Sequence, residues 1–167
     1  DIAIYNNVEY VYQNYDSFNY VKGLPKLALL CKFFNDNYNK YTTNITTHFE
    51  NKKFAIVINN KKLSKMQSEC IQKIIELGDV DSIMHTHFSK IDYYNGTQYK
   101  NFIDYISKYK YIIIFEPDII PGLVTKDIFS SFFAKSIPIY LGASDITRFI
   151  SDETFIKYDT KNPNRTL

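Results

Sequence analysis

The sequence predicts an α/β domain built on a Rossmann-like, mostly parallel β-sheet. Two observations lead to this prediction. Short apolar runs rich in Ile, Val and Tyr recur from residue 53 onward, and each has the length and composition of a buried strand. Amphipathic stretches with helical spacing separate these runs, and strands that alternate with helices along a chain typically form parallel sheets.

Four apolar runs are the predicted strands. Their β-branched and aromatic side chains favour a position in the interior of a sheet, and their lengths are ordinary for strands. In chain order the runs are KFAIVIN (53–59), VDSIMH (80–85), YKYIIIFE (109–116) and IPIYLG (137–142).

Three helices are predicted between these strands. The first spans 64–78, with Ser64 as N-cap and Gly78 just past its end; its apolar positions at helical spacing are Met66, Cys70, Ile74 and Leu77. The second spans 98–109, and one of its faces carries Phe102, Ile103, Ile106 and Tyr109. The third, VTKDIFSSFFAKS, spans 124–136.

These patterns divide the chain into three segments of different composition. Residues 1–52 are polar-aromatic or rich in Asn and Thr, and we interpret them as an N-terminal linker or edge segment. Residues 53–160 hold the predicted ligand-binding domain, and residues 161–167 form a tail. Because the chain begins with Asp1 and not Met, we expect a fragment or a processed form.

Composition narrows the classes of function. The net charge of +2 and the absence of a basic cluster argue against a nucleic-acid partner. Cys31 and Cys70 lie in apolar or helical contexts and are interpreted as two buried thiols. No signal peptide or membrane span is visible, and the sequence leaves the compartment open.

The loops that follow the predicted strands are the candidate binding region. Ligands of open parallel sheets bind beyond the carboxyl ends of the strands, so the loops 59–65, 116–122 and 142–145 matter most. Two of them lead into helices with Lys or Thr nearby, and a helix N-terminus suits a phosphate. This pattern indicates a nucleotide or another phosphorylated ligand, although no glycine-rich phosphate motif is present.

The stretch YKYIIIFEPDIIPGLVTKDIFSSFFAKSIPIYLGASDITRFISDETFI resembles the donor-site signature of glycosyltransferase family 10, the α-1,3/4-fucosyltransferases. The resemblance extends over residues 53–157, since KFAIVINN and Val80-Asp81-Ser82 also match family positions. The matching positions within the signature are Tyr109-Lys110-Tyr111, Phe115-Glu116, Gly122, Val124-Thr125, Ile128, Ile137-Pro138-Ile139-Tyr140, Gly142, Phe149 and Phe155-Ile156.

This resemblance implies the C-terminal half of a GT-B glycosyltransferase, which binds GDP-fucose. The implied reaction is inverting transfer of fucose to a hydroxyl of a glycan acceptor, with no obligatory metal or other cofactor. An N-terminal acceptor-binding half is the implied partner, and we expect the catalytic base to lie in that half, outside this chain. The implied donor-binding residues are Lys65, Glu116, Gly122, Val124, Thr125 and Lys126.

The chain departs from the family pattern at the donor site. Pro117 stands where the family has an Asn, and Leu123 and Leu141 replace aromatic residues. The family order Glu-Lys is reversed in Lys126-Asp127. The family's phosphate-binding Arg has no counterpart, and Lys65 is the nearest basic residue.

These departures leave two alternatives open. One is a degenerate, non-catalytic module of the same fold that binds carbohydrate or a partner. The other is a transferase that uses a different nucleotide sugar. Single residues also have alternative roles. The carboxyl group of Glu116 could form hydrogen bonds within its own loop, and Lys126 could be a solvated surface side chain.

Two further motifs have a simpler interpretation. His85 and His87 would share one face of a strand, but no third ligand is evident, so we assign no metal site. Three Asn-X-Thr triplets, at 44–46, 95–97 and 164–166, fit glycosylation acceptors, yet such triplets arise easily in an Asn- and Thr-rich chain.

Overall fold

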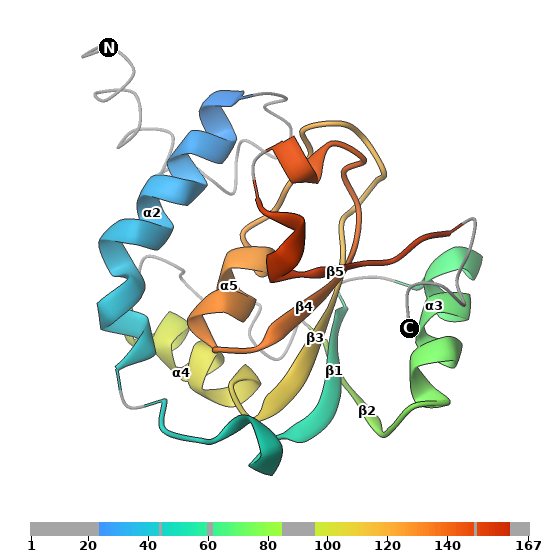
Figure 1. Cartoon of the computed structure of the whole chain (residues 1–167), viewed down its shortest axis with the longest axis horizontal. Coiled ribbons are helices and arrows are strands. Elements are labelled where there is room, and N and C mark those ends of the chain that lie inside the picture. Colours follow the sequence, from blue (N-terminus) through green and yellow to red (C-terminus); the bar gives the residue numbers. More distant parts are fainter. Residues whose placement is uncertain (1–23, 44, 60–61, 85–95, 149, 161–167) are drawn as a thin grey trace.

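A five-stranded parallel sheet lies at the centre of the computed structural model of the chain (Figure 1). The structure describes residues 24–43, 45–59, 62–84, 96–148 and 150–160. The elements are α2 (Leu24–Thr42), η2 (Phe49–Asn51), β1 (Lys53–Asn59), α3 (Lys65–Ile75), β2 (Val80–Met84), α4 (Gly96–Ile106), β3 (Tyr109–Phe115), α5 (Asp127–Phe133), β4 (Ile137–Leu141), η4 (Ile146–Arg148), η5 (Asp152–Thr154) and β5 (Ile156–Lys157).

The strand order confirms the predicted fold class. The sheet runs β2-β1-β3-β4-β5, and each neighbouring pair is parallel. The chain moves outward from β1 to β2 and then crosses back to β3, which pairs with the other side of β1. The order therefore reverses between β1 and β3, and parallel sheets bind ligands at such a reversal.

Helices cover both faces of the sheet, as Figure 1 shows, with α2, α4 and α5 on one side and α3 on the other. Alternate residues of a strand point to opposite faces. Ile56 and Ile112 accordingly pack with the first group of helices, whereas Val57 and Ile113 pack against α3. The central strands β1, β3 and β4 are largely buried on both faces, which is why they appear in the sequence as continuous apolar runs.

Helix α3 begins where the sequence predicts. Ser64 is the N-cap, and it forms a capping box in which its hydroxyl accepts the Gln67 N–H and its own N–H donates to the Gln67 side chain. The helix ends earlier than predicted, at Ile75, so Gly78 lies beyond its cap. Leu77, predicted on the apolar face, is 54% exposed, because the helical turn that would bury it is absent.

Helix α5 is shorter than the predicted 124–136. Its first helical residue is Asp127, and the N–H of Thr125, just ahead of the helix, donates to the carboxylate of Glu116. At the other end, Lys135 adopts a positive φ of 51°. The buried ammonium group of Lys52 caps this end of the helix by donating hydrogen bonds to the carbonyls of Ala134 and Lys135.

The N-terminal segment differs from the prediction. Residues 24–42, interpreted from sequence as part of a linker or edge segment, form the 19-residue helix α2, which packs on α5. Phe34 contacts the ring of Phe133, and the ring of Tyr41 lies against Tyr99 in the core. The domain limits themselves stay a prediction.

Other differences are local. The two-residue strand β5 has no counterpart among the predicted strands, and Tyr109, predicted on a helix face, begins β3. His85 and His87 lie outside the described residues, as do the Asn44, Asn95 and Asn164 of the three triplets. No helix in the described ranges is both long and apolar enough to cross a bilayer.

Candidate functional site

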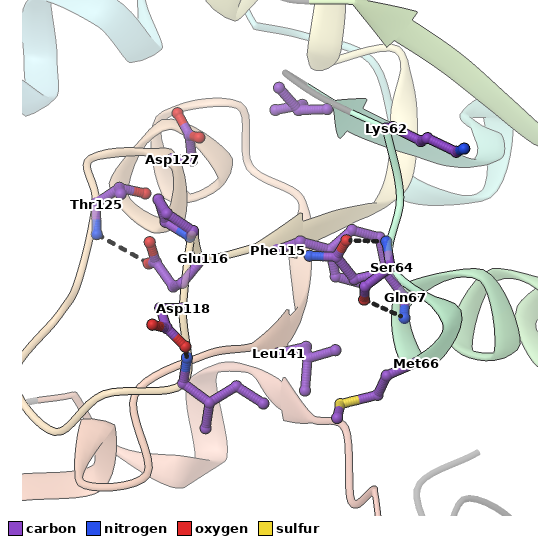
Figure 2. Close-up of a pocket in the computed structure, with 13 residues that line it drawn as sticks. Lys62, Ser64, Met66, Gln67, Phe115, Glu116, Asp118, Thr125, Asp127 and Leu141 are labelled. Atoms are coloured by element: carbon purple, nitrogen blue, oxygen red, sulfur yellow. Dashed lines mark hydrogen bonds between the residues drawn. The ribbon is translucent and has the colours of Figure 1, made fainter.

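A cavity of about 430 Å³ opens at the carboxyl edge of the sheet, where β1 and β3 diverge (Figure 2). It lies at the reversal of strand order, the position at which a sheet of this order binds its ligand. Its lining residues are Ile58, Lys62, Ser64, Met66, Gln67, Phe115, Glu116, Pro117, Asp118, Ile119, Thr125, Asp127 and Leu141.

The cavity has two chemically different walls. The loop after β1 and the first turn of α3 form one wall, with Lys62 as its basic side chain and the Ser64–Gln67 capping box at its edge. The loop after β3 forms the other wall, and its polar side chains there are Glu116, Asp118, Thr125 and Asp127. One wall thus offers a cation and a helix N-terminus, and the other offers carboxyl groups.

Glu116 is the most unusual of these carboxyl groups, because it is only 3% exposed. Its Oε1 accepts the backbone N–H of Thr125 at 2.8 Å. Within the described part of the chain, Oε2 has no hydrogen-bond partner. No described ion pair involves this carboxyl group either. A buried carboxylate without a counter-charge is costly.

Burial raises the pKa of Glu116 to about 7. The N–H of Thr125 lowers this pKa, and the negative charge of Asp127 raises it. Burial likewise raises the pKa of the neighbouring Tyr140 hydroxyl, with a further contribution from Glu116. Glu116 therefore changes its charge close to neutral pH, at the floor of the cavity.

Gly142 fixes the position of Glu116 from the end of β4. A Cβ at this position would collide with Cγ of Glu116 and would lie 2.6 Å from the hydroxyl of Tyr140. Tyr140 is fully buried, and its hydroxyl accepts the N–H of Ala143 at 3.1 Å. Only a glycine leaves room for the carboxyl group beside the tyrosine.

A second carboxylate braces the loop between β3 and α5. The N–H of Gly122 donates to Asp145 Oδ1 at 2.7 Å, and Gly122 has a φ of 74°, which favours glycine. Asp145 follows β4, so this bond joins the second and third of the loops that the sequence singles out. Gly122 shapes the loop but does not line the cavity.

Of the reversed pair Lys126-Asp127, the acid is the residue that lies at the cavity. Asp127 lines the cavity, and Lys126, the N-cap position of α5, does not. Consecutive helical residues differ in direction by about 100°, so only one of the two can face the ligand wall. Exchanging the family order therefore places a carboxyl group where the family resemblance implies a lysine.

Two other predicted donor-site residues also lie away from the cavity. The side chain of Lys65 is 92% exposed and pairs with Glu69 on the same helix at 3.8 Å. Val124 is a core residue that packs with the helices of the opposite face of the sheet. Of the six predicted positions, the cavity brings together Glu116 and Thr125.

Several lining residues were not among the sequence predictions for the site. Ser64 and Gln67 carry a readable signal, because Ser-X-X-Gln before an apolar periodic stretch is a capping box. Lys62 is one of several lysines close together in the sequence, and the sequence pattern alone does not show which of them lines the cavity. No group of three or more His, Cys, Asp or Glu side chains suited to a metal ion occurs in the described ranges.

The comparisons with known proteins agree with this geometry. The family model "Glycosyltransferase family 10 (fucosyltransferase) C-term" matches residues 47–167. A search of curated protein sequences found no match. A solved structure described as "Crystal Structure of alpha1,3-Fucosyltransferase" superposes with a TM-score of 0.56 at 18% identity, over 82% of this chain and 36% of that chain.

That structural likeness concerns the fold, and it supports the predicted class, a parallel α/β half of a GT-B fucosyltransferase. This chain spans about a third of the length of that protein. The family match is the evidence for membership of the family, because it extends over most of the chain and includes both walls of the cavity. The chain belongs to glycosyltransferase family 10, the fucosyltransferase family, and carries the family's C-terminal region.

Proposed function

We propose that this chain forms the donor-binding half of a fucosyltransferase, which takes GDP-fucose and transfers fucose, with inversion, to a hydroxyl of a glycan acceptor. One observation carries the proposal. The cavity lies at the strand-order reversal between β1 and β3, and both of its walls fall within the residues that match the family.

The two walls suggest how the donor would be oriented. The diphosphate would lie toward Lys62 and the N-terminus of α3, where a positive side chain and the helix dipole favour negative charge. The sugar and ribose hydroxyls would lie toward Asp127, Asp118 and the Thr125 side of the cavity, where carboxyl oxygens accept hydrogen bonds.

The chemistry divides between this chain and the remainder of the enzyme. In an inverting transfer, the acceptor oxygen attacks the anomeric carbon while the bond to the β-phosphate oxygen breaks. Negative charge develops on the departing GDP, and Lys62 with the start of α3 would stabilise it. We assign the base that removes the acceptor proton to a region outside this chain, consistent with a match over 36% of the neighbour's length.

A transferase with another nucleotide sugar is the second candidate. The observation in its favour is Asp127, which lines the cavity in place of the implied lysine. A carboxylate there weakens the attraction for phosphate and adds a hydrogen-bond acceptor. Such a change alters which part of a donor the site holds most tightly.

Calorimetric titration with GDP, GDP-fucose, UDP and UDP-sugars tests both candidates. We expect micromolar binding of GDP and GDP-fucose, and UDP weaker by about tenfold or more. Lys62→Ala should weaken GDP binding by about fivefold to tenfold. The matched control is Lys65→Ala, which removes an exposed lysine three residues away and should leave the affinity unchanged.

The outcomes separate the candidates. A clear preference for UDP-sugars would replace the first candidate with the second. Folded protein that binds none of these nucleotides would contradict both. Equal losses for the two lysine variants would contradict the assignment of the basic wall.

A further inference from the structure

Glu116 is a buried acid with one oxygen left open at the cavity. It is 3% exposed, and Oε1 is occupied by the N–H of Thr125. In the described ranges, Oε2 accepts no hydrogen bond, and the residue lines the cavity where a ligand would enter. A carboxyl group in this setting either holds a proton or faces a cation.

On balance, the surroundings of Glu116 favour the proton. Burial is the largest cause, and within the cavity wall Asp127 of α5 and Asp118 of the same loop add negative charge. Thr125 and the hydroxyl of Tyr140, which faces the carboxyl group from beside Gly142, act the other way and lower its pKa, but burial outweighs them. Two further charged groups, Asp145 and Lys62, lie farther from Glu116.

Asp145, beyond the end of β4, adds its negative charge on the side of Tyr140. Lys62 is the basic residue of the lining, and Figure 2 shows it on the wall opposite Glu116. The carboxyl groups closest to Glu116 therefore make its negative form unfavourable, and no described cation contacts it to offset them.

An anionic ligand in the same cavity increases this effect. A diphosphate brings negative charge close to Oε2, and its arrival also excludes water from the cavity. Both changes disfavour the ionised carboxyl group. Binding of the ligand and of the proton are then linked, so each strengthens the other by the same factor.

We propose that Glu116 takes up a proton when the cavity binds a diphosphate-bearing ligand, so that ligand affinity declines as the pH rises above neutral. This inference rests on the proposed function, since the diphosphate is that of the proposed nucleotide donor. It concerns Glu116 as a residue that tunes the charge of the site, and no bond is made or broken at its carboxyl group.

The direct test is calorimetric titration with GDP in buffers of different ionisation enthalpy, which measures the number of protons taken up on binding. At pH 7.5 we expect wild type to take up about half a proton more than Glu116→Gln. Glutamine keeps the size of the side chain and has no titrating proton. GDP's own phosphate titration contributes equally to both proteins and cancels in the difference.

The pH dependence of affinity gives a second measurement in the same titrations. Between pH 6.5 and 8.5, the wild-type Kd should rise by about threefold to tenfold more than the Kd of Glu116→Gln. Glu153→Gln is the matched control, since it makes the same change at an exposed residue that does not line the cavity and should keep the wild-type proton uptake.

A ligand-free experiment tests the proton on Glu116 independently. Because the folded pKa is raised from 4.5 to about 7, the unfolded state loses its proton first as the pH rises. Wild type should therefore lose stability between about pH 4.5 and 7 relative to Glu116→Gln, seen as a lower unfolding midpoint in urea. Parallel curves for the two proteins would overturn the inference whatever the ligand.

The two proposals fail differently. Absence of GDP binding at every pH contradicts the proposed function and this linkage together, while the ligand-free curves still report the state of Glu116. GDP binding with equal proton uptake in wild type and Glu116→Gln contradicts the linkage alone.

Discussion

Glu116 Oε1 accepts the backbone N–H of Thr125 at 2.8 Å, and this bond ties the end of β3 to the approach of α5. The two residues are nine positions apart and enclose the loop that forms the acidic wall of the cavity. The bond uses the N–H of Thr125 before the helix begins. Helix α5 follows directly, with Asp127 as its first helical residue.

Gly142→Ala should reduce both stability and ligand affinity. The added methyl group collides with Glu116 and Tyr140, both buried, so we expect a loss of about 1–3 kcal/mol in the free energy of unfolding. Displacement of Glu116 should also weaken GDP binding. Chemical denaturation and calorimetric titration measure the two effects.

Gly78→Ala is the matched control for this substitution. Its methyl group would lie 2.5 Å from the ring of Phe54, near the amino end of β1, whereas the cavity lies at the carboxyl end of that strand. We expect a similar loss of stability with unchanged GDP affinity. A Gly142→Ala protein that binds GDP like wild type would show that the position of Glu116 is irrelevant to the site.

Restoring an acid-then-base order should strengthen nucleotide binding. The double variant Lys126→Asp/Asp127→Lys keeps the net charge but replaces a carboxyl group of the cavity wall by an ammonium group. We expect GDP affinity to increase by about fivefold to thirtyfold, in line with a gain of roughly 1–2 kcal/mol at a partly exposed site. Calorimetry measures the change.

Lys126→Ala supplies the comparison, because Lys126 does not line the cavity. This single variant should change the affinity by less than about threefold. A large loss in Lys126→Ala, with no gain in the double variant, would mean that Lys126 and not Asp127 faces the ligand.

Lys52→Met should destabilise the fold without affecting the site. Lys52 Nζ donates to the carbonyls of Ala134 and Lys135 and to Ser136 Oγ, and methionine leaves these acceptors without their donor. We expect a loss of about 1–3 kcal/mol in the free energy of unfolding. Lys53→Met, at an adjacent lysine that is 66% exposed, should have a much smaller effect on stability.

The same lysine predicts a pH effect of definite sign. Burial and the charge of Lys135 lower the pKa of Lys52 from 10.5 to about 8. Between these values the unfolded state binds more protons than the folded state, so stability rises with pH. Wild type should gain about 1–2 kcal/mol relative to Lys52→Met from pH 8 to 10.5, less than the full shift because solvent screens part of the charge. A flat difference would contradict the burial of the ammonium group.

Cys70 should be unreactive in the folded protein. Its thiol is fully buried beneath α3, and burial raises its pKa from 9.0 to about 12. In a Cys31→Ser background, thiol labelling at pH 8 should be slow until denaturant unfolds the chain. Rapid labelling without denaturant would mean that α3 does not cover this face of the sheet.

The parallel sheet could be predicted because its strands are buried on both faces. Burial produces continuous runs such as 53–59 and 109–116, which stand out from the polar loops. Helix α2 escaped prediction because few of its described side chains, at 32 and 34–42, are buried and its sequence is rich in Asn and Lys. β5 is two residues long, too short for any periodicity to appear.

The site could be predicted only in outline. Sequence patterns and the family resemblance point to the loops after β1 and β3, and to Glu116. Which lysine lines the cavity depends on where each helix starts, since one residue turns a side chain by about 100°. The capping box at Ser64 shows in the sequence where α3 begins, but it does not show that the side chain of Lys65 is 92% exposed. The sequence also does not show that α5 begins at Asp127, which lines the cavity, and not at residue 124.

The central claim is that the nucleotide binds at the carboxyl edge of the sheet, between the loops after β1 and β3. Titration of isotope-labelled protein with GDP, followed by backbone amide chemical shifts, tests it most directly. The account predicts that the largest shift changes fall at residues 62–67 and 116–127, with little change at Lys53, Asp81 and Tyr109 on the opposite edge. Changes centred on that opposite edge, or no changes in folded protein at saturating GDP, would contradict it.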